Sequence, residues 1–131
     1  MDDGARPPVW IGHAVLRVSD LGRSVQWWSG IGMREIERNE HVAVLELRGG
    51  THLVLVPGAP DTGDAPFDLM VDDLDAWWTQ VISLDLPANF GVTEPKAPAV
   101  QPWGLRIAYV VDPSGVLWHF AERRPEVEHD R

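Results

Sequence analysis

The sequence predicts an α+β fold in which two tandem β-α-β-β-β modules form a curved, cup-like mixed sheet with helices on its outer face. Three observations predict it. Residues 18–21 (Val-Ser-Asp-Leu) recur as residues 71–74 (Val-Asp-Asp-Leu), which indicates an internal duplication. A strand-like alternation precedes each copy, and apolar residues at helical spacing follow it. A segment rich in Pro and Gly, about residues 58–66, separates the copies. Pairing the two modules would cover their edges and leave a concave surface between them.

The first module is expected to span about residues 9–57. Residues 10–18 alternate and contain β-branched residues, so they predict a strand. Ser19 or Asp20 is a suitable N-cap for a helix that carries apolar residues at Leu21 and Trp28. Glycines at residues 30 and 32 suit the end of that helix. Three more strands are predicted at residues 33–38, 42–47 and 51–56.

The second module is expected to span about residues 67–122, so the chain of residues 1–131 forms a single domain. A strand at 67–71 leads into a helix that Asp72 or Asp73 caps and that ends near residue 83. Residues 84–104 are predicted to be irregular, with an uncertain strand near 91–95; long connections of this kind often border binding sites. A closing hairpin is predicted from strands at 105–111 and 116–121 around an Asp-Pro-Ser-Gly turn.

Composition excludes several classes of function. The chain has 131 residues, a formal net charge of −9 and no cysteine, which rules out a disulfide scaffold and a thiolate metal site. The chain has no basic cluster beyond Arg123-Arg124, so we expect no nucleic-acid partner. We also expect no membrane partner, because no apolar run approaches the ~20 residues of a membrane span. The acidic N-terminal residues do not resemble a signal peptide, and we expect a cytoplasmic protein.

The ordered motifs of the chain resemble the vicinal oxygen chelate superfamily, which includes glyoxalase I, extradiol dioxygenases, fosfomycin resistance enzymes and bleomycin resistance proteins. The resemblance covers roughly residues 9–122. Each motif alone is weakly specific, whereas their order along the chain is fairly specific. The motifs lie at residues 13–21, 27–28, 30–33, 71–74, 102–106, 112–115 and 118–122. The resemblance implies paired modules and a homodimer.

Enzymes of this superfamily hold a divalent metal on the concave face, with ligands from the first strand of each module and the last strand of one or both. At the first-strand positions this chain has His13, a competent ligand, and Pro66, which is not one. At the last-strand positions it has Val54 and His119. Two imidazoles therefore stand where the resemblance implies three or four ligands, and catalytic sites generally supply three protein groups.

Two further residues could complete the ligand set. Asp68 lies two residues after Pro66, and His52 lies two residues before Val54, so each shares a strand face with the position it would replace. A divalent ion (Zn, Ni, Mn or Fe) on His13, His119 and either Asp68 or His52 is thus a candidate cofactor, although no firm metal site is predicted. The displacement of about 6–7 Å along a strand counts against it.

Four residues are predicted to contact a small-molecule ligand: His13, Trp103, Arg106 and His119. Trp103 lies in a Pro-Trp-Gly loop where no periodicity buries it, and in resistance-type relatives the corresponding loop borders the drug groove. Arg106 follows that loop and could neutralise an anionic group. The tryptophans at positions 27, 28, 77, 78 and 118 are expected in the core.

We therefore expect a homodimeric small-molecule binding protein of the glyoxalase and bleomycin resistance type, whose ligand is an aromatic drug or a metabolite. The alternative is a metal-dependent lyase, isomerase or dioxygenase that acts on a substrate with vicinal oxygens. A third hypothesis is an interaction module that keeps the fold without binding small molecules.

Overall fold

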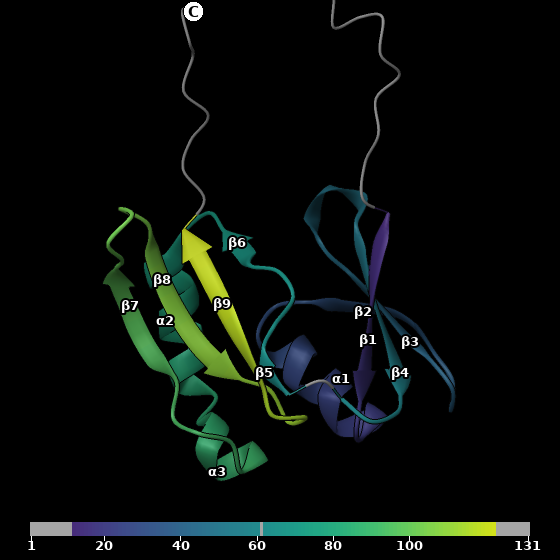
Figure 1. The fold of residues 1–131 in the computed structure, drawn as a ribbon. Coiled ribbons are helices and arrows are strands. Elements are labelled where there is room, and N and C mark those ends of the chain that lie inside the picture. Colours follow the sequence, from purple (N-terminus) through teal and green to yellow (C-terminus); the bar gives the residue numbers. More distant parts are fainter. Residues whose placement is uncertain (1–11, 61, 123–131) are drawn as a thin grey trace, which may run out of the picture.

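The computed structural model describes residues 12–60 and 62–122, which form two mixed sheets and several helices of an α+β fold (Figure 1). In the first sheet, sheet A, the strand order is β1-β4-β3-β2, and β1 pairs in parallel with β4 while the other pairs are antiparallel. Its elements are β1 (His13–Val18), α1 (Leu21–Gly30), β2 (Arg34–Arg38), β3 (Ala43–Glu46), the 3-10 turn η2 (Arg48–Gly50) and β4 (His52–Pro57).

The second sheet, sheet B, repeats this arrangement. Strands β5 and β6 both pair in parallel with β9, and β8 and β7 continue the sheet in antiparallel orientation. Its elements are β5 (Gly63–Asp64), β6 (Leu69–Val71), α2 (Leu74–Ser83), α3 (Leu86–Phe90), β7 (Lys96–Val100), β8 (Arg106–Val111) and β9 (Val116–Glu122). In Figure 1 the two sheets stand side by side, and the linker passes between them near β5. In both halves the first and the last strand pair in parallel, so the two copies of the sequence repeat have the same strand topology.

Both long helices begin at the leucine that ends the repeated motif, and the aspartate before it is the N-cap. The Oδ1 atom of Asp20 accepts a hydrogen bond from the backbone N–H of Arg23 at 3.1 Å, and that of Asp73 accepts one from the N–H of Ala76 at 3.0 Å. Each bond satisfies a backbone donor that a helix start leaves free. Of the two N-caps considered for each helix, Asp20 and Asp73 are the ones used. No helix in the described part of the chain has the length and hydropathy needed to cross a bilayer.

Tryptophans from both halves meet in one continuous core. Trp27, Trp28 and Trp118 are completely buried, which confirms the prediction for these three. Trp28 of α1 meets Trp118 of β9 edge to face, with ring centroids 4.9 Å apart. Aromatic pairs in this geometry are stabilising beyond the area that they bury. The first helix is therefore packed against the last strand of the other half.

The second half also caps the end of α1. The indole Nε1 of Trp77 donates to the carbonyl oxygen of Ile31 at 3.1 Å, and the side-chain amide of Gln80 donates to that of Gly30 at 2.9 Å. The last carbonyls of a helix have no partner within the helix. Two side chains of α2 thus complete the hydrogen bonding of a helix in the other module.

The hairpin turn between β8 and β9 is organised by Asp112, which is almost fully buried. Its Oδ1 accepts from the backbone N–H groups of Ser114 and Val116 at 2.8 and 3.0 Å, and its Oδ2 accepts from the indole of Trp118 at 2.9 Å. Burial raises the pKa of this carboxyl, while hydrogen bonds from Trp118 and from backbone N–H groups of the turn oppose the rise. The hydroxyl of Ser114 accepts from the N–H of Ser19 at 3.1 Å, so the turn also contacts the start of α1.

The segment expected to be irregular contains elements that the sequence pattern did not indicate. Residues 86–90 form the single-turn helix α3, and the second strand of the second module lies at 96–100, after the 91–95 stretch considered for it. The linker contains the two-residue strand β5. One helical turn or two strand residues are too short to produce a periodic pattern, which explains why these elements were missed.

Candidate functional site

His13 and His52 are neighbours on the face of sheet A that is turned away from the core. The parallel register of β1 and β4 pairs the two residues directly. On β4, Leu53 and Leu55 are buried in the core, so the alternate residues, His52 among them, lie on the opposite face. We call this surface the open face of sheet A. The sequence suggested His52 only as a displaced substitute, whereas the register places it beside His13.

Glu46 extends this pair into a row of polar residues across sheet A. The antiparallel register pairs Glu46 of β3 with His52 of β4. On its other side, the carboxylate of Glu46 lies 3.5 Å from the guanidinium of Arg34 on β2. Both side chains are well exposed, so this ion pair contributes little to stability. The row therefore contains two imidazoles and one carboxylate, and this carboxylate already forms an ion pair with Arg34.

His119 occupies the corresponding open face of sheet B, between two carboxylates. The register pairs it with Tyr109, and the two rings meet edge to face with centroids 4.8 Å apart. The Nε2 atom of His119 lies 3.6 Å from Asp64, and its Nδ1 atom lies 3.5 Å from Asp68. Each ring nitrogen thus faces a different carboxylate. Asp68 and His119, both considered as ligands from the sequence, are brought together.

The polar pairs of the two halves do not occupy equivalent positions. Val18 and Val71 are equivalent in the repeat; His13 precedes Val18 by five residues, whereas Asp68 precedes Val71 by three. The two pairs are therefore offset by two residues, or about 6–7 Å along a strand. This offset explains why the sequence repeat aligned His119 with Val54 rather than with His52.

The donors do not fit a resident divalent ion within one chain. Catalytic metal sites generally supply three protein ligands that converge on one point. Across residues 12–60 and 62–122, no three histidine, aspartate or glutamate side chains gather closely enough to hold a metal ion. At His119 the two carboxylates lie at different ring nitrogens, so they do not converge with one nitrogen on a common centre.

Arg106 lies on the other face of sheet B, away from His119. Its guanidinium bonds to the carboxylate of Asp75 on α2 at 2.6 Å and lies 3.2 Å from that of Glu122 on β9. The hydrogen bond with Asp75 raises the pKa of Arg106 and lowers the pKa of Asp75, although burial opposes both shifts. The side chain of Arg106 thus joins α2 to the base of the β7–β8 loop, and it is not directed to the imidazoles of His13 and His119.

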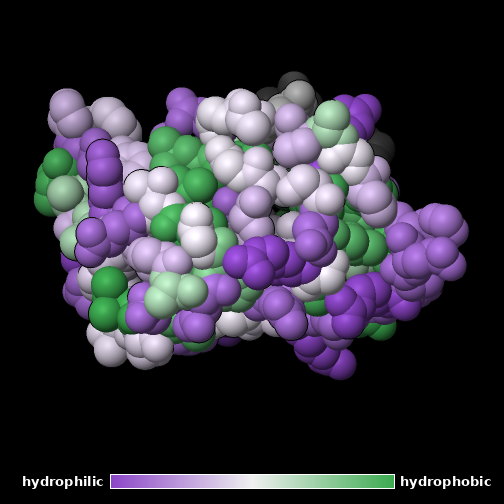
Figure 2. Space-filling view, turned by 90° about the horizontal axis from the view of Figure 1, so that it is seen from below, coloured by the Kyte–Doolittle hydropathy of each residue, from purple (hydrophilic) through white to green (hydrophobic). Residues whose placement is uncertain are grey.

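Trp103 lies at the surface of the β7–β8 loop. Its exposed fraction is 65%, and the nearby Val100 is also exposed. Backbone hydrogen bonds of 2.8 Å close the loop from Gln101 to Leu105 and to Gly104. Gly104 has a φ of 93°, which glycine adopts without strain. From below, apolar residues form separate patches among polar ones on the molecular surface (Figure 2). An exposed indole on an ordered loop is available to a ligand.

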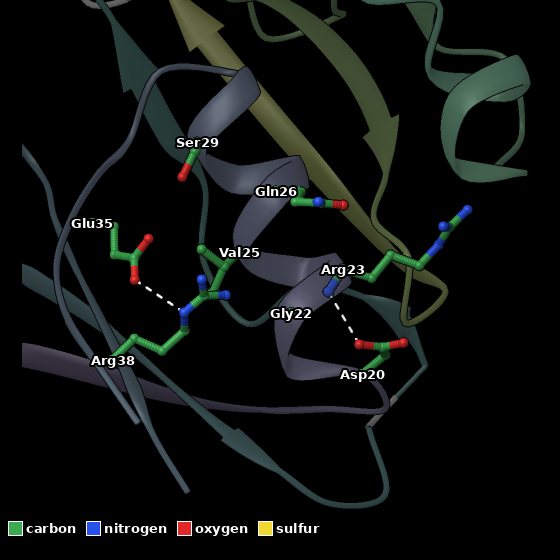
Figure 3. Close-up of a pocket in the computed structure, with 8 residues that line it drawn as sticks. All are labelled: Asp20, Gly22, Arg23, Val25, Gln26, Ser29, Glu35 and Arg38. Atoms are coloured by element: carbon green, nitrogen blue, oxygen red, sulfur yellow. Dashed lines mark hydrogen bonds and ion pairs between the residues drawn. The ribbon is translucent and has the colours of Figure 1, made fainter. Parts of the chain in front are cut away.

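A further pocket, of about 450 Å³, lies between α1 and β2 (Figure 3). Its charges are largely engaged by neighbours. The guanidinium of Arg38 lies 3.1 Å from Glu35, and Asp20 caps the helix. Arg23 points toward α3, where it lies over the Phe90 ring and donates to the carbonyl of residue 89. We interpret these residues as structural rather than as ligand contacts.

Asp64 is a site residue that the sequence did not indicate. It lies in the linker, where residues 58–66 have no periodicity, and β5 brings it beside His119 by pairing with β9. A strand of two residues gives no local signal, so this contact follows only from the sheet pairing.

The fold is similar to solved structures of known proteins. A bleomycin-binding protein solved in complex with bleomycin has a TM-score of 0.70 and 22% identity, over 89% of this chain and 100% of that one. A lactoylglutathione lyase from Agrobacterium tumefaciens has a TM-score of 0.70 and 20% identity, over 89% and 96%. A glyoxalase/bleomycin resistance protein from Catenulispora acidiphila DSM 44928 has 0.66 and 26%, over 88% and 100%.

No curated protein matches the sequence. The family model for the Glyoxalase/Bleomycin resistance protein/Dioxygenase superfamily matches residues 10–120, which is most of the chain. That range contains both repeats and all four predicted ligand contacts. With the repeated strand-helix-strand topology and the structural likeness above, this match shows that the chain belongs to the Glyoxalase/Bleomycin resistance protein/Dioxygenase superfamily.

Proposed function

We propose that this protein binds a small organic molecule at the open faces of its sheets and does so without a resident metal ion. The arrangement of the donors carries this proposal: His13 and His52 form one pair, Asp68 and His119 form another, and no three such side chains among the described residues gather closely enough to hold a metal ion. Paired imidazoles and carboxylates can accept and donate hydrogen bonds to a ligand without metal. The bleomycin-binding protein of the same fold supports ligand binding in this superfamily.

In this proposal Trp103 supplies an aromatic contact, and His13 and His119 supply polar ones. Large exposed indoles provide contact area at a small cost in conformational entropy. Arg106 has a structural role in this proposal: its ion pairs with Asp75 and Glu122 hold the base of the loop that carries Trp103. The ligand itself is an aromatic drug or a metabolite.

We further propose that the protein is a cytoplasmic homodimer. The open faces support the pairing of two copies, because Val15 on β1 and Met70 on β6 are 56% and 49% exposed. A second copy that packs against these faces would cover both side chains. The cytoplasmic location remains a prediction from the sequence.

Bleomycin is a suitable first probe of the proposed function. We expect it to quench the tryptophan fluorescence of the native protein to saturation, and we expect Trp103→Ala to weaken binding by roughly 30-fold, as the removal of a central aromatic contact does. A fluorescence titration measures both. Ile82→Ala is the control: it removes an exposed apolar side chain on α2, away from the Trp103 loop, and should leave the affinity for bleomycin unchanged. Unaltered binding by the Trp103→Ala variant would contradict the role given to this loop.

A metal-dependent enzyme is a second candidate function, because the two polar pairs could jointly supply four ligands in a dimer. Our proposal predicts well under one equivalent of Zn²⁺ or Mn²⁺ per chain after incubation and desalting, and the same content in His52→Ala. Elemental analysis of both proteins measures it. One tightly held equivalent that disappears in His52→Ala would favour the enzyme, since His52 is the neighbour of His13.

A further inference from the structure

A pocket of about 420 Å³ lies in the seam between the two halves of a single chain. One wall comes from β1, the η2 region and the start of β4, and the other comes from residues 67–70 at β6. This volume is in the range of ligand sites and is sufficient for a single-ring organic molecule. Since both walls belong to the same chain, the pocket needs no second copy. Most of its lining is apolar: Ala14, Leu47, Leu53, Phe67, Leu69 and Met70.

The charged groups of this seam pocket favour a cation. Arg48 lines it, but the guanidinium lies 3.0 Å from the carboxylate of Asp72, which compensates its charge. Asp68 also lines it, and its half-exposed carboxylate faces His119 at 3.5 Å. That distance is too long for a strong hydrogen bond, and a carboxylate has about four acceptor positions. The carboxylate of Asp68 can therefore accept from a ligand while it faces His119.

We infer that the seam pocket binds a small organic cation, with an ammonium group against the carboxylate of Asp68 and an apolar body between Leu53 and Phe67. Charge-assisted hydrogen bonds to a carboxylate are stronger than neutral ones. The net charge of −9 also raises the local concentration of cations. This site shares Asp68 with the proposed function but goes beyond it, because it involves neither Trp103 nor a second copy of the chain.

Methyl NMR of protein labelled with ¹³C-methyl methionine tests the inference. The probe is the 2-phenylethylammonium ion, and 2-phenylethanol is its uncharged counterpart. We expect the ammonium to shift the Met70 methyl signal to saturation. Met70 lines both the seam pocket and a neighbouring pocket, whereas Met33 lines only the neighbouring one, so a smaller shift of Met33 assigns the ammonium to the seam pocket. Asp68→Asn should weaken binding about tenfold, and 2-phenylethanol should bind the native protein about tenfold more weakly than the ammonium does.

Asp64→Asn is the matched control. It removes the same charge beside the same imidazole, at 3.6 Å, but Asp64 lines another cavity and not the seam pocket. We expect less than a twofold change. Equal losses in both variants would reduce the effect to net charge and overturn the inference, as would an unmoved Met70 signal or equal binding of the alcohol.

Trp103→Ala separates this site from the proposed function. The Met70 shift should persist in that variant with unchanged affinity. Loss of the Met70 shift in Trp103→Ala would assign the cation to the Trp103 loop and would overturn the inference of a separate site. Failure of bleomycin to bind, with the Met70 shift intact, would reject the proposed function and leave this inference standing.

Discussion

Trp118→Ala is expected to lower the free energy of unfolding by about 3–5 kcal/mol, as truncation of a fully buried tryptophan does. The side chain has no exposed surface, meets the Trp28 ring at 4.9 Å and the Phe67 ring at 5.2 Å, and donates to Asp112 at 2.9 Å. Alanine would leave a cavity at the junction of the two halves and would remove the indole donor of Asp112. Urea unfolding followed by circular dichroism measures the loss.

Trp103→Ala is the matched control for this prediction. It is the same substitution at a position whose side chain is largely exposed, so we expect a change within about 0.5 kcal/mol. A loss below about 1 kcal/mol for Trp118→Ala would mean that Trp28 and Phe67 close the cavity, and that the aromatic cluster does not join the halves as described.

Asp112→Asn is expected to lower the free energy of unfolding by about 1–3 kcal/mol. One oxygen of Asp112 accepts two backbone N–H groups and the other accepts the Trp118 indole. An asparagine has a single side-chain oxygen, so its amide group would face either the indole or the backbone donors. A buried donor would then remain without an acceptor. Denaturant unfolding of both proteins gives the difference.

The effect of Asp112 on stability depends on pH in a defined direction. Burial raises the pKa of Asp112 in the folded protein above its ordinary value of 3.8. Between the ordinary and the raised pKa, the folded state holds a proton that the unfolded state has released. The contribution of Asp112 therefore decreases as pH rises through this window. The stability gap between the native protein and Asp112→Asn should shrink across the same window, and a gap that widens would contradict the sign of the shift.

The fold could be predicted from the sequence because its signals are local and duplicated. Two aspartate N-caps, two alternating strands and two helical patterns occur in the same order, and each specifies an element without long-range information. Residues 86–90 are an exception. Their helix is one turn long and begins after Asp85, whose φ of 47° is a left-handed conformation that no pattern indicates.

The candidate site could be predicted only in part, because its contacts depend on register between strands. The sequence placed His13, His52, Asp68 and His119 among the candidates. Their partners follow from the parallel pairing of first and last strands, which a linear repeat does not specify. Arg106 illustrates the limit: it is the first residue of β8 and has the opposite parity to Tyr109, so it points to α2 instead of the open face.

The hydrogen bonds that Trp77 and Gln80 donate to the end of α1 have a consequence for how such a chain could have arisen and diverged. A module whose helix end depends on donors from the other module is no longer self-sufficient. Separating the halves would leave carbonyl oxygens of one half without these donors, and the indole and amide groups of the other half without these acceptors. An exchange of one half for another sequence must therefore preserve the side chains that reach across.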